Sequence, residues 1–405
     1  MLSLSEARDA ILDGARPGEP ISVALTEALG LVLAEPAMAD VDLPPFDRAR
    51  RGGYAVRGVD AWRGARLRVV DAQGFGDGMG LQVHAGEAAR VRTGAPMPVG
   101  ADAVLTMHDA RAEPHEGHGR LVEILNGADV GDNVATRGEL LEAGDAIAPA
   151  GTVVRPSTIP LLASQGCVYP ICHRRARVAV VAVGDELVNP VDAPTLNRER
   201  SAANLAVLVP CLAWGAAAQD LGAVGSDQAD SALDRALNAS VVLVLGEHGG
   251  AVPRALRRAG VEMLFDGVAM QPGGRIGYGV IRDGQGGVVN HVFHLSARPT
   301  EALIGTVLLV GPLVARLHGR DDRLGGLPAR LDEGHVAHAE RAQVVPVTVR
   351  VSADGTLHAR PVAHRGPADL PGLAAADALA LLAPRAGAWQ TGELTEILPL
   401  GAPWA

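Results

Sequence analysis

Apolar residues change their spacing along this chain, and the changes divide it into regions of different secondary structure. Ser3 and Glu6 have the spacing of a capping box ahead of a helical stretch at 7–12, and a second helical stretch is predicted at 25–32. Beyond residue 54 the pattern becomes short β runs separated by glycine and aspartate turns, at 67–70, 104–107 and 121–125. This pattern predicts a small β domain inserted into the chain.

The middle of the chain alternates between strand and helix patterns. Continuous apolar runs at 178–183 and 241–245 are typical of parallel strands covered on both faces, and helices are predicted at 204–214, 253–259 and 303–317. This alternation predicts a doubly wound α/β sheet with its ligand at the carboxyl ends of the strands. The segments Gly184-Asp185-Glu186 and Gly246-Glu247-His248 fall at those ends.

The last part of the chain has a hairpin pattern. Strands at 344–351 and 357–362 flank an Asp354-Gly355 turn, and further β runs lie at 379–382 and 394–400. The fold class is therefore mixed α/β and β with several domains. We predict an elongated helical first domain (1–43 with 138–172), an inserted β domain (44–137), an α/β domain (173–319) and a C-terminal β domain (324–405).

Charge and cysteine content narrow the function. The 405 residues carry a net charge of −10 and contain no lysine, so every fixed side-chain cation is an arginine. This balance argues against nucleic acid as a partner and excludes a Schiff-base lysine. Three cysteines, with Cys167 and Cys172 too far apart for a zinc knuckle, favour a reducing, cytoplasmic location.

No membrane association is expected. The first residues lack the basic and apolar regions of a signal peptide. The apolar run 302–317 contains two glycines and a proline and is too short to cross a bilayer, so it is predicted to be a buried helix.

Four motifs follow one another in an order typical of one enzyme family. They are Asp42-Leu43-Pro44-Pro45-Phe46-Asp47, Arg92-Thr93-Gly94-Ala95-Pro96-Met97-Pro98-Val99-Gly100-Ala101-Asp102-Ala103-Val104, Val183-Gly184-Asp185-Glu186-Leu187, and Gly267-Val268-Ala269-Met270-Gln271-Pro272-Gly273. On these motifs the chain resembles the MoeA/gephyrin molybdopterin molybdenumtransferases over nearly its whole length. The resemblance implies insertion of molybdate into adenylylated molybdopterin with Mg²⁺, at a site shared between the subunits of a homodimer.

The resemblance also assigns candidate residues. Glu186 and Asp185 would face the metal and the substrate, and Thr93 would donate to an oxyanion. The alternatives are that the two acids are only solvated at a strand end and that the Thr93 hydroxyl only stabilises a turn.

Several positions depart from the family pattern. Gly52 replaces an aspartate beside the arginines 48, 50 and 51, and the substrate loop after the second buried strand is reduced to Gly246-Glu247-His248-Gly249-Gly250. The family's Met-Lys-Pro-Gly-Lys becomes Met270-Gln271-Pro272-Gly273-Gly274, with Arg275 one residue further on. The ligand positions predicted to remain are Gly246, Gly249, Gly250, Arg275, Arg298 and Asn204.

The histidines and the arginine loop leave alternatives open. His291 and His294 should point to opposite faces of a strand, whereas His115 and His118 lie in a polar loop with a weak metal-site pattern. His248 is either a loop residue or a new member of the substrate loop. The arginines 48, 50 and 51 form either a solvated loop or an anion-binding one.

Two functional hypotheses follow. The chain is either a working molybdenumtransferase or a homologue with impaired catalysis that serves as a binding or scaffold protein. In the second case its ligand would be a molybdopterin or nucleotide-like anion held by arginines rather than through a metal.

Overall fold

The computed structural model describes residues 1–70, 81–114, 120–195, 197–320, 325–363, 366 and 369–400, so the two histidines at 115 and 118 lie outside the described residues. Backbone contacts divide the chain into two compact units. The first unit comprises Met1–Ala34, Gly151–Arg155 and Ile171–Ala405, and the second comprises Glu35–Ala150 and Pro156–Pro170. The four domain boundaries proposed from the sequence stay predictions.

A six-stranded sheet forms the centre of the first unit. In spatial order its strands are β16 (Ala217–Val224), β13 (Arg177–Val183), β17 (Val241–Gly246), β21 (Val288–Leu295), β20 (Gly277–Arg282) and β18 (Glu262–Asp266). The first four are parallel, β20 runs antiparallel to them, and the edge strand β18 is antiparallel to β20 and so runs in the direction of the first four. Strand β17 is buried at every position, which confirms the doubly covered strand that its apolar run predicts.

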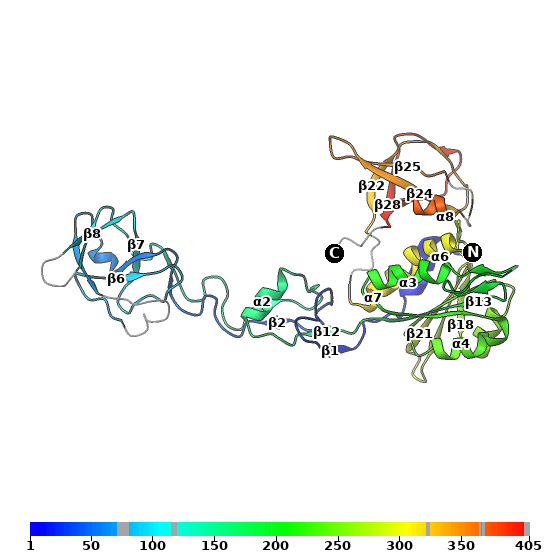
Figure 1. The fold of residues 1–405 in the computed structure, drawn as a ribbon, viewed down its shortest axis with the longest axis horizontal. Helices are drawn as coiled ribbons and strands as arrows, with labels where there is room; N and C mark the ends of the chain where they lie inside the picture. Colours follow the sequence, from blue (N-terminus) through cyan, green and yellow to red (C-terminus); the bar gives the residue numbers. More distant parts are fainter. Residues whose placement is uncertain are drawn as a thin grey trace. The chain divides into compact units, whose positions relative to one another are not determined.

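Helices cover both faces of this sheet. Side chains of α1 (Leu4–Leu12), α3 (Ala203–Ala213), α6 (Pro299–Gly305) and α7 (Gly311–Leu317) form one core with alternate residues of β13. The remaining β13 side chains pack with α4 (Ala229–Ala236) and α5 (Val252–Arg258) on the other face. Figure 1 shows α3, α6 and α7 on one side of the sheet and α4 on the other. The predicted doubly wound fold is confirmed.

The N-terminal capping box is also confirmed. The Glu6 backbone N–H donates to Ser3 Oγ at 3.2 Å, and the Ser3 N–H donates to Glu6 Oε2 at 2.8 Å.

The helix predicted at 25–32 is wrong. Residues 31–33 are extended, because Leu33 N–H donates to the Thr152 carbonyl and Val154 N–H to the Leu31 carbonyl. Pairing with a distant segment overrides the local helical pattern.

The apolar run near residue 310 is a buried helix, as predicted, but its predicted length is wrong. Segments α6, the π-helical turn η3 (Thr306–Val310) and α7 are continuous from Pro299 to Leu317, which is 19 residues. Length and composition alone would let such a helix cross a membrane, yet 67% of it is buried inside the protein. It is therefore a core helix of the first unit.

The first unit ends in a small barrel. Strands β24 (Ala342–Val351), β25 (Leu357–Pro361), β22 (Leu327–Leu331), β28 (Leu394–Pro399) and β26 (Ala378–Leu382) pair in this order, and β26 closes on β24. The predicted β24–β25 hairpin is present. Strand β19 (Met270–Gln271) joins β24 in parallel, so the segment after β18 is tied to the barrel. Helix α8 (Leu370–Ala374) completes this part.

The second unit contains another six-stranded sheet. Its strands are β7 (Ala103–Thr106), β4 (Gly53–Val56), β6 (Glu87–Val91), β5 (Arg66–Val70), β9 (Arg120–Ile124) and β8 (Ala110–Pro114). This sheet contains the three β runs predicted from the sequence. Helix α2 (Thr158–Ser164) and the 3-10 turn η1 (Gly58–Asp60) lie in the same unit.

Short elements complete the description. In the first unit these are the strand pairs β1 (Pro20–Ser22) with β12 (Ile171–His173), β14 (Leu187–Val188) with β15 (Glu199–Arg200) and β23 (His335–Val336) with β27 (Ala388–Trp389), and the 3-10 turn η2 (Ser226–Gln228). In the second unit they are β2 (Ala37–Met38) with β11 (Ala146–Ala148) and β3 (Arg48–Ala49) with β10 (Val134–Ala135).

Candidate functional site

Loops from five strands meet at one edge of the central sheet of the first unit. Strands β13, β17 and β21 are parallel and end there. Because β20 runs the other way and β18 runs in their direction, β20 begins and β18 ends at the same edge, where Gly277 pairs with both His294 and Asp266. We call this the carboxyl edge. It brings together the Asp185-Glu186 turn, the loop 246–250, Arg275 and Arg298, as the sequence predicts for a doubly wound sheet.

A pair of stacked histidines lies at this edge. The rings of His248 and His294 are 4.2 Å apart between centroids and inclined by 18°. The Nε2 atoms of both rings are buried and have no hydrogen-bond partner among the described protein groups. Unsatisfied buried nitrogens are costly, so they are the atoms that a bound polar molecule could satisfy.

The two rings are neutral near pH 7. Burial, together with the neighbouring His248, lowers the pKa of His294 to about 3, against a hydrogen bond to the Gly246 backbone that raises it. Burial also lowers the pKa of His248, although the Asp266 carboxylate opposes this. The 3.7 Å approach of His248 Nε2 to Asp266 Oδ1 is therefore a contact of a neutral ring and is too long for a hydrogen bond.

Charged groups of both signs surround the histidine pair. Arg275 lowers the pKa of His248 and Glu301 raises it, so both charges act on this ring. Arg298 is exposed at the N-terminal cap of α6 and lies 3.8 Å from Glu301. His294, Asp266 and Glu301 were not predicted as site residues. His294 could have been found from the sequence, because strand alternation separates it from His291, which faces the core with Phe293 and Leu295.

The two acids after β13 have different surroundings. Asp185 Oδ1 accepts the Ser226 N–H at 2.8 Å, and this backbone hydrogen bond lowers the pKa of Asp185. Glu186 is exposed and its carboxylate folds back over Gly184, where an added Cβ would be 2.5 Å from Glu186 Oε1. Asp185 therefore fixes a turn, while Glu186 is the more available carboxylate.

The glycines of the loop 246–250 fall into two kinds. Gly246 is buried at the end of β17, and an added Cβ would be 2.8 Å from Val252 Cγ2. Gly249 and Gly250 are exposed, and nothing lies within 4 Å of an added Cβ at Gly249. The Gly250 N–H donates to the Glu247 carbonyl at 3.2 Å, so the N–H open to a ligand is that of Gly249, whereas Gly246 is required by packing.

Asn204 is engaged inside the protein. It is 1% exposed, accepts from Ser201 Oγ at 2.6 Å and donates to Asp220 Oδ1 at 2.7 Å and to the Gly222 carbonyl at 3.2 Å. These bonds use both ends of its amide and join α3 to β16. The geometry gives Asn204 a structural role.

The backbone before Arg275 leaves no room for a side chain at Gly274, where the family pattern has its second lysine. An added Cβ on Gly274 would be 2.5 Å from the Met270 carbonyl oxygen and 2.7 Å from the Val268 carbonyl oxygen. Such contacts with backbone cannot be relieved by a small side-chain shift. The backbone here leaves room only for glycine, and the nearest cation is the exposed Arg275.

Thr93 lies in the second unit, beside the altered aspartate position. A Cβ added to Gly52 would lie 3.5 Å from Thr93 N and 3.7 Å from Thr93 Oγ1, which are ordinary contacts. At the next residue, Gly53, an added Cβ would lie 1.9 Å from the Leu105 carbonyl oxygen, because β4 and β7 pair there. The pairing of the strands thus requires glycine at position 53. At position 52 there is room for a side chain, so packing does not require the loss of the acid there.

The arginines beside Gly52 do not act as a group. Arg50 donates to Glu139 Oε2 at 2.5 Å and to the Val134 carbonyl at 3.1 Å, so it holds β10 and the following turn. Arg48 lies in strand β3, which pairs with β10, and Arg51 is exposed. Arg50 is therefore not available to bind an anion in this loop.

The aspartates of the first motif also have structural partners. Asp42 accepts from Arg137 and from the Ala143 N–H, and the Asp47 carboxylate accepts the Arg137 N–H at 2.7 Å. The backbone hydrogen bond from Ala143, together with Arg137, lowers the pKa of Asp42. These contacts join the segments 42–47 and 137–143 of the second unit.

Comparison with known proteins now decides the family. The family models described as MoeA N-terminal region (domain I and II) and MoeA C-terminal region (domain IV) match residues 2–166 and 328–400. Molybdopterin molybdenumtransferase 1 of Mycobacterium tuberculosis is 32% identical over 351 residues, which cover 78% of each chain. The chain belongs to the MoeA family.

Other relatives agree. Molybdopterin molybdenumtransferase of Bacillus subtilis is 29% identical over 312 residues, covering 74% of this chain and 71% of that protein. The crystal structure of the molybdopterin biosynthesis MoeA protein from Pyrococcus horikosii matches with a TM-score of 0.83 and 26% identity over 99% of both chains. The MoeA fold expected from the motifs is confirmed.

We predict that Asn204→Ala destabilises the protein without weakening anion binding. The change leaves Asp220 and Ser201 without their buried partner, which should cost about 1–3 kcal/mol of unfolding free energy. Chemical unfolding measures this cost, and Leu205→Ala, at the exposed neighbouring position, should change it by less than about 0.5 kcal/mol. A large loss of anion affinity in folded Asn204→Ala would contradict the structural role.

We predict opposite outcomes for restoring two family side chains. Gly52→Asp meets only ordinary contacts and should leave stability within about 0.5 kcal/mol, whereas Gly274→Lys should cost roughly 1–3 kcal/mol or more. Thermal unfolding compares them, with Gly249→Ala as a glycine substitution into open space. Equal stability of Gly52→Asp and Gly274→Lys would contradict this difference.

We predict that the sheet loses stability as pH falls below about 6.5. Burial lowers the pKa of His294 to about 3, so between these values the unfolded chain binds a proton that the folded chain does not. Stability is therefore complete above pH 6.5 and falls toward pH 3, by up to about 1.4 kcal/mol per pH unit for this group. Hydrogen exchange of β17 and β21, corrected for intrinsic rates, should show a smaller slope in His294→Phe. The exposed control His108→Gln should keep the wild-type slope.

Proposed function

We propose that this MoeA family protein acts in molybdenum cofactor biosynthesis by binding a molybdopterin-type or nucleotide-like anion at the carboxyl edge, with molybdate insertion slow or absent. One observation carries the proposal: a neutral histidine stack and two arginines occupy the edge where the family motifs place acids and lysines. Arg275 and Arg298 would bind phosphate oxygens, and the N–H group of the exposed Gly249 would add to them.

Magnesium has few ligands here. Within the described part of the chain, no group of three or more histidine, cysteine, aspartate or glutamate side chains could hold a metal ion. Asp185 already accepts a backbone N–H, so Glu186 is the main carboxylate left for a cation. Mg²⁺ prefers six oxygens and would have to take most of them from ligand and water. We therefore propose arginine-held, metal-independent binding.

The alternative is a working molybdenumtransferase. Asp185, Glu186 and Thr93 remain at their motif positions, and this favours some residual activity. Against it, each lost transition-state contact typically costs on the order of a hundredfold in rate. The resemblance also supports a cytoplasmic homodimer, which we propose along with the ligand.

Arg275→Ala tests the binding proposal. In titration calorimetry with a molybdopterin-type ligand, wild-type affinity should fall with salt and stay unchanged in EDTA. Arg275→Ala should lose about tenfold or more, because a charge-assisted hydrogen bond contributes about 1.5–3 kcal/mol. Arg257→Ala, on the exposed side of α5, is the matched control and should bind as wild type.

Complementation tests the catalytic part. Expression in cells that lack their own molybdenumtransferase should restore little or no molybdoenzyme activity. Full restoration would favour the working enzyme. Binding that requires Mg²⁺ and ignores Arg275→Ala would show that Glu186 and Asp185 define the site.

A further inference from the structure

A second cavity lies at the opposite edge of the same sheet. Its volume is about 710 Å³. It is lined by the loop after α1, the residues leading into β13, Ser240 immediately before β17, and the hairpin between β20 and β21. Since β13, β17 and β21 are parallel, their first residues mark the amino edge of the sheet, away from the carboxyl edge described above.

The charge of this amino-edge cavity is strongly positive. Five arginines line it against a single acid, Glu19; they are Arg16, Arg174, Arg175, Arg177 and Arg282. Like charges gathered in one concavity repel each other, and an anion bound among them would relieve the repulsion. This excess contrasts with the net charge of −10 of the chain.

The arginines differ in what already holds them. Arg175 donates to the Gly215 carbonyl at 3.0 Å, and Arg282 donates to Glu262 and to the Gly286 carbonyl, both at 3.2 Å. The guanidinium groups of Arg174 and Arg177 are on exposed residues and have no hydrogen bond or ion pair within the described ranges. Arg16 donates to the Ala15 carbonyl at 3.3 Å. Three positioned cations and two available ones therefore share the cavity.

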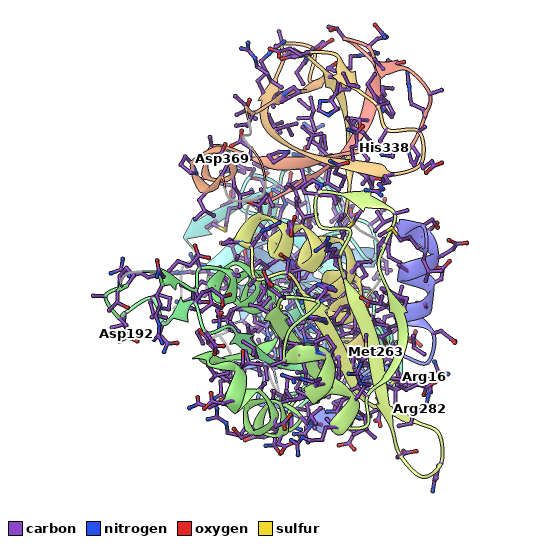
Figure 2. The ribbon with its side chains drawn as sticks, turned by 90° about the vertical axis from the view of Figure 1, so that its right-hand side faces the viewer. Arg16, Asp192, Met263, Arg282, His338 and Asp369 are labelled. Atoms are coloured by element: carbon purple, nitrogen blue, oxygen red, sulfur yellow. The ribbon has the colours of Figure 1, made fainter. Side chains whose placement is uncertain are left out.

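Backbone contacts fix the available pair. The Arg174 N–H donates to the Glu19 carbonyl at 3.0 Å, and the Arg177 N–H donates to Ser240 Oγ at 3.2 Å. Figure 2 shows Arg16 and Arg282 beside each other at the base of the β20–β21 hairpin, and both line this cavity. The cations thus come from several segments but are held around one space.

The cavity also has an apolar side. Val288, Val289, Leu317 and Pro17 line it together with His291, whose Nδ1 is 2.8 Å from the Tyr278 hydroxyl. Burial keeps this imidazole neutral by lowering its pKa to about 4. An apolar wall beside a cationic wall, in a volume of several hundred Å³, is typical of sites for small organic ligands.

We infer that the amino-edge cavity binds a small organic polyphosphate of the nucleoside di- or triphosphate class. Arg174 and Arg177 hold the phosphates, and the Val288–Val289 wall contacts the ring. The concave shape suits a compact ligand, and the negative net charge of the chain opposes nucleic acid or an anionic membrane. This inference does not depend on the function proposed for the carboxyl edge.

Titration of ATP in EDTA tests the inference in the Arg275→Ala background, which removes one of the two arginines of the carboxyl edge. One ATP should bind per chain. Adding either Arg174→Ala or Arg177→Ala should weaken the affinity for ATP by about tenfold or more, since each change removes a charge-assisted contact. Arg257→Ala is the control for the loss of one positive charge, and circular dichroism verifies folding of every variant.

Two further measurements test the apolar wall. Val289→Asp places a carboxylate at an exposed position of the wall and should weaken the affinity for ATP by about tenfold or more. Inorganic tripolyphosphate, which lacks a ring, should bind more weakly than ATP. Equal affinities of ATP and tripolyphosphate would overturn the nucleotide assignment.

Other outcomes would overturn the site itself. These are ATP binding that is absent in Arg275→Ala, or that stays within twofold of that background in Arg174→Ala and Arg177→Ala. Tighter binding of a single-stranded oligonucleotide or of phosphatidylserine vesicles at the same arginines would show a macromolecular partner instead. ATP binding that is insensitive to Arg275→Ala but lost in Arg177→Ala supports this inference, and the carboxyl-edge proposal is then decided by its own titration with a molybdopterin-type ligand.

Discussion

Burial of strands β13 and β17 on both faces is the constraint on which the first unit depends. Each strand sends alternate side chains into two separate cores, one with α1, α3, α6 and α7 and the other with α4 and α5. Fully burying a valine or leucine side chain contributes about 1.5–3 kcal/mol, so a register slip of one residue would be very costly. This register brings the loops 184–186, 246–250 and 295–298 to one edge, and the arginines 16, 174, 177 and 282 to the other.

Backbone requirements and side-chain losses can be separated at the altered motifs. Gly53 and Gly274 face carbonyl oxygens that an added Cβ would overlap, whereas Gly52 has room for one. The backbone of this chain therefore has no room for a lysine at position 274. The missing aspartate at Gly52 leaves the backbone around Thr93 able to accept it.

The sequence correctly predicts those elements that are surrounded by apolar side chains on every side. The predictions of strands at 178–183 and 241–245 were correct. A strand buried on both faces is apolar at every position, so it can be recognised without knowing which elements cover it. The helix at 25–32 was wrong because Leu31 and Leu33 bond to residues more than a hundred positions away. Motif order could identify the fold, because it reflects relatives with a similar arrangement of domains.

Site residues were harder to predict, because their roles depend on partners that sequence spacing does not reveal. Asn204 has the residue type of a ligand, but Asp220 and Gly222 consume its amide. Arg50 has the charge of an anion site, but Glu139 neutralises it. Conversely, His248 gains its environment from His294, 46 positions later, through the pairing of β17 with β21.

The two edges of the sheet differ in how their charges are balanced. At the carboxyl edge, Asp266 and Glu301 oppose the effect of Arg275 on the pKa of His248, Glu301 also lies 3.8 Å from Arg298, and the histidine rings stay neutral. At the amino edge, Glu19 is the single acid lining a cavity that five arginines share. A balanced edge selects a ligand by hydrogen-bond geometry, since its long-range field is small. An edge with excess positive charge attracts polyanions before any specific contact forms, and its selectivity must come from the shape of the apolar wall at Val288 and Val289.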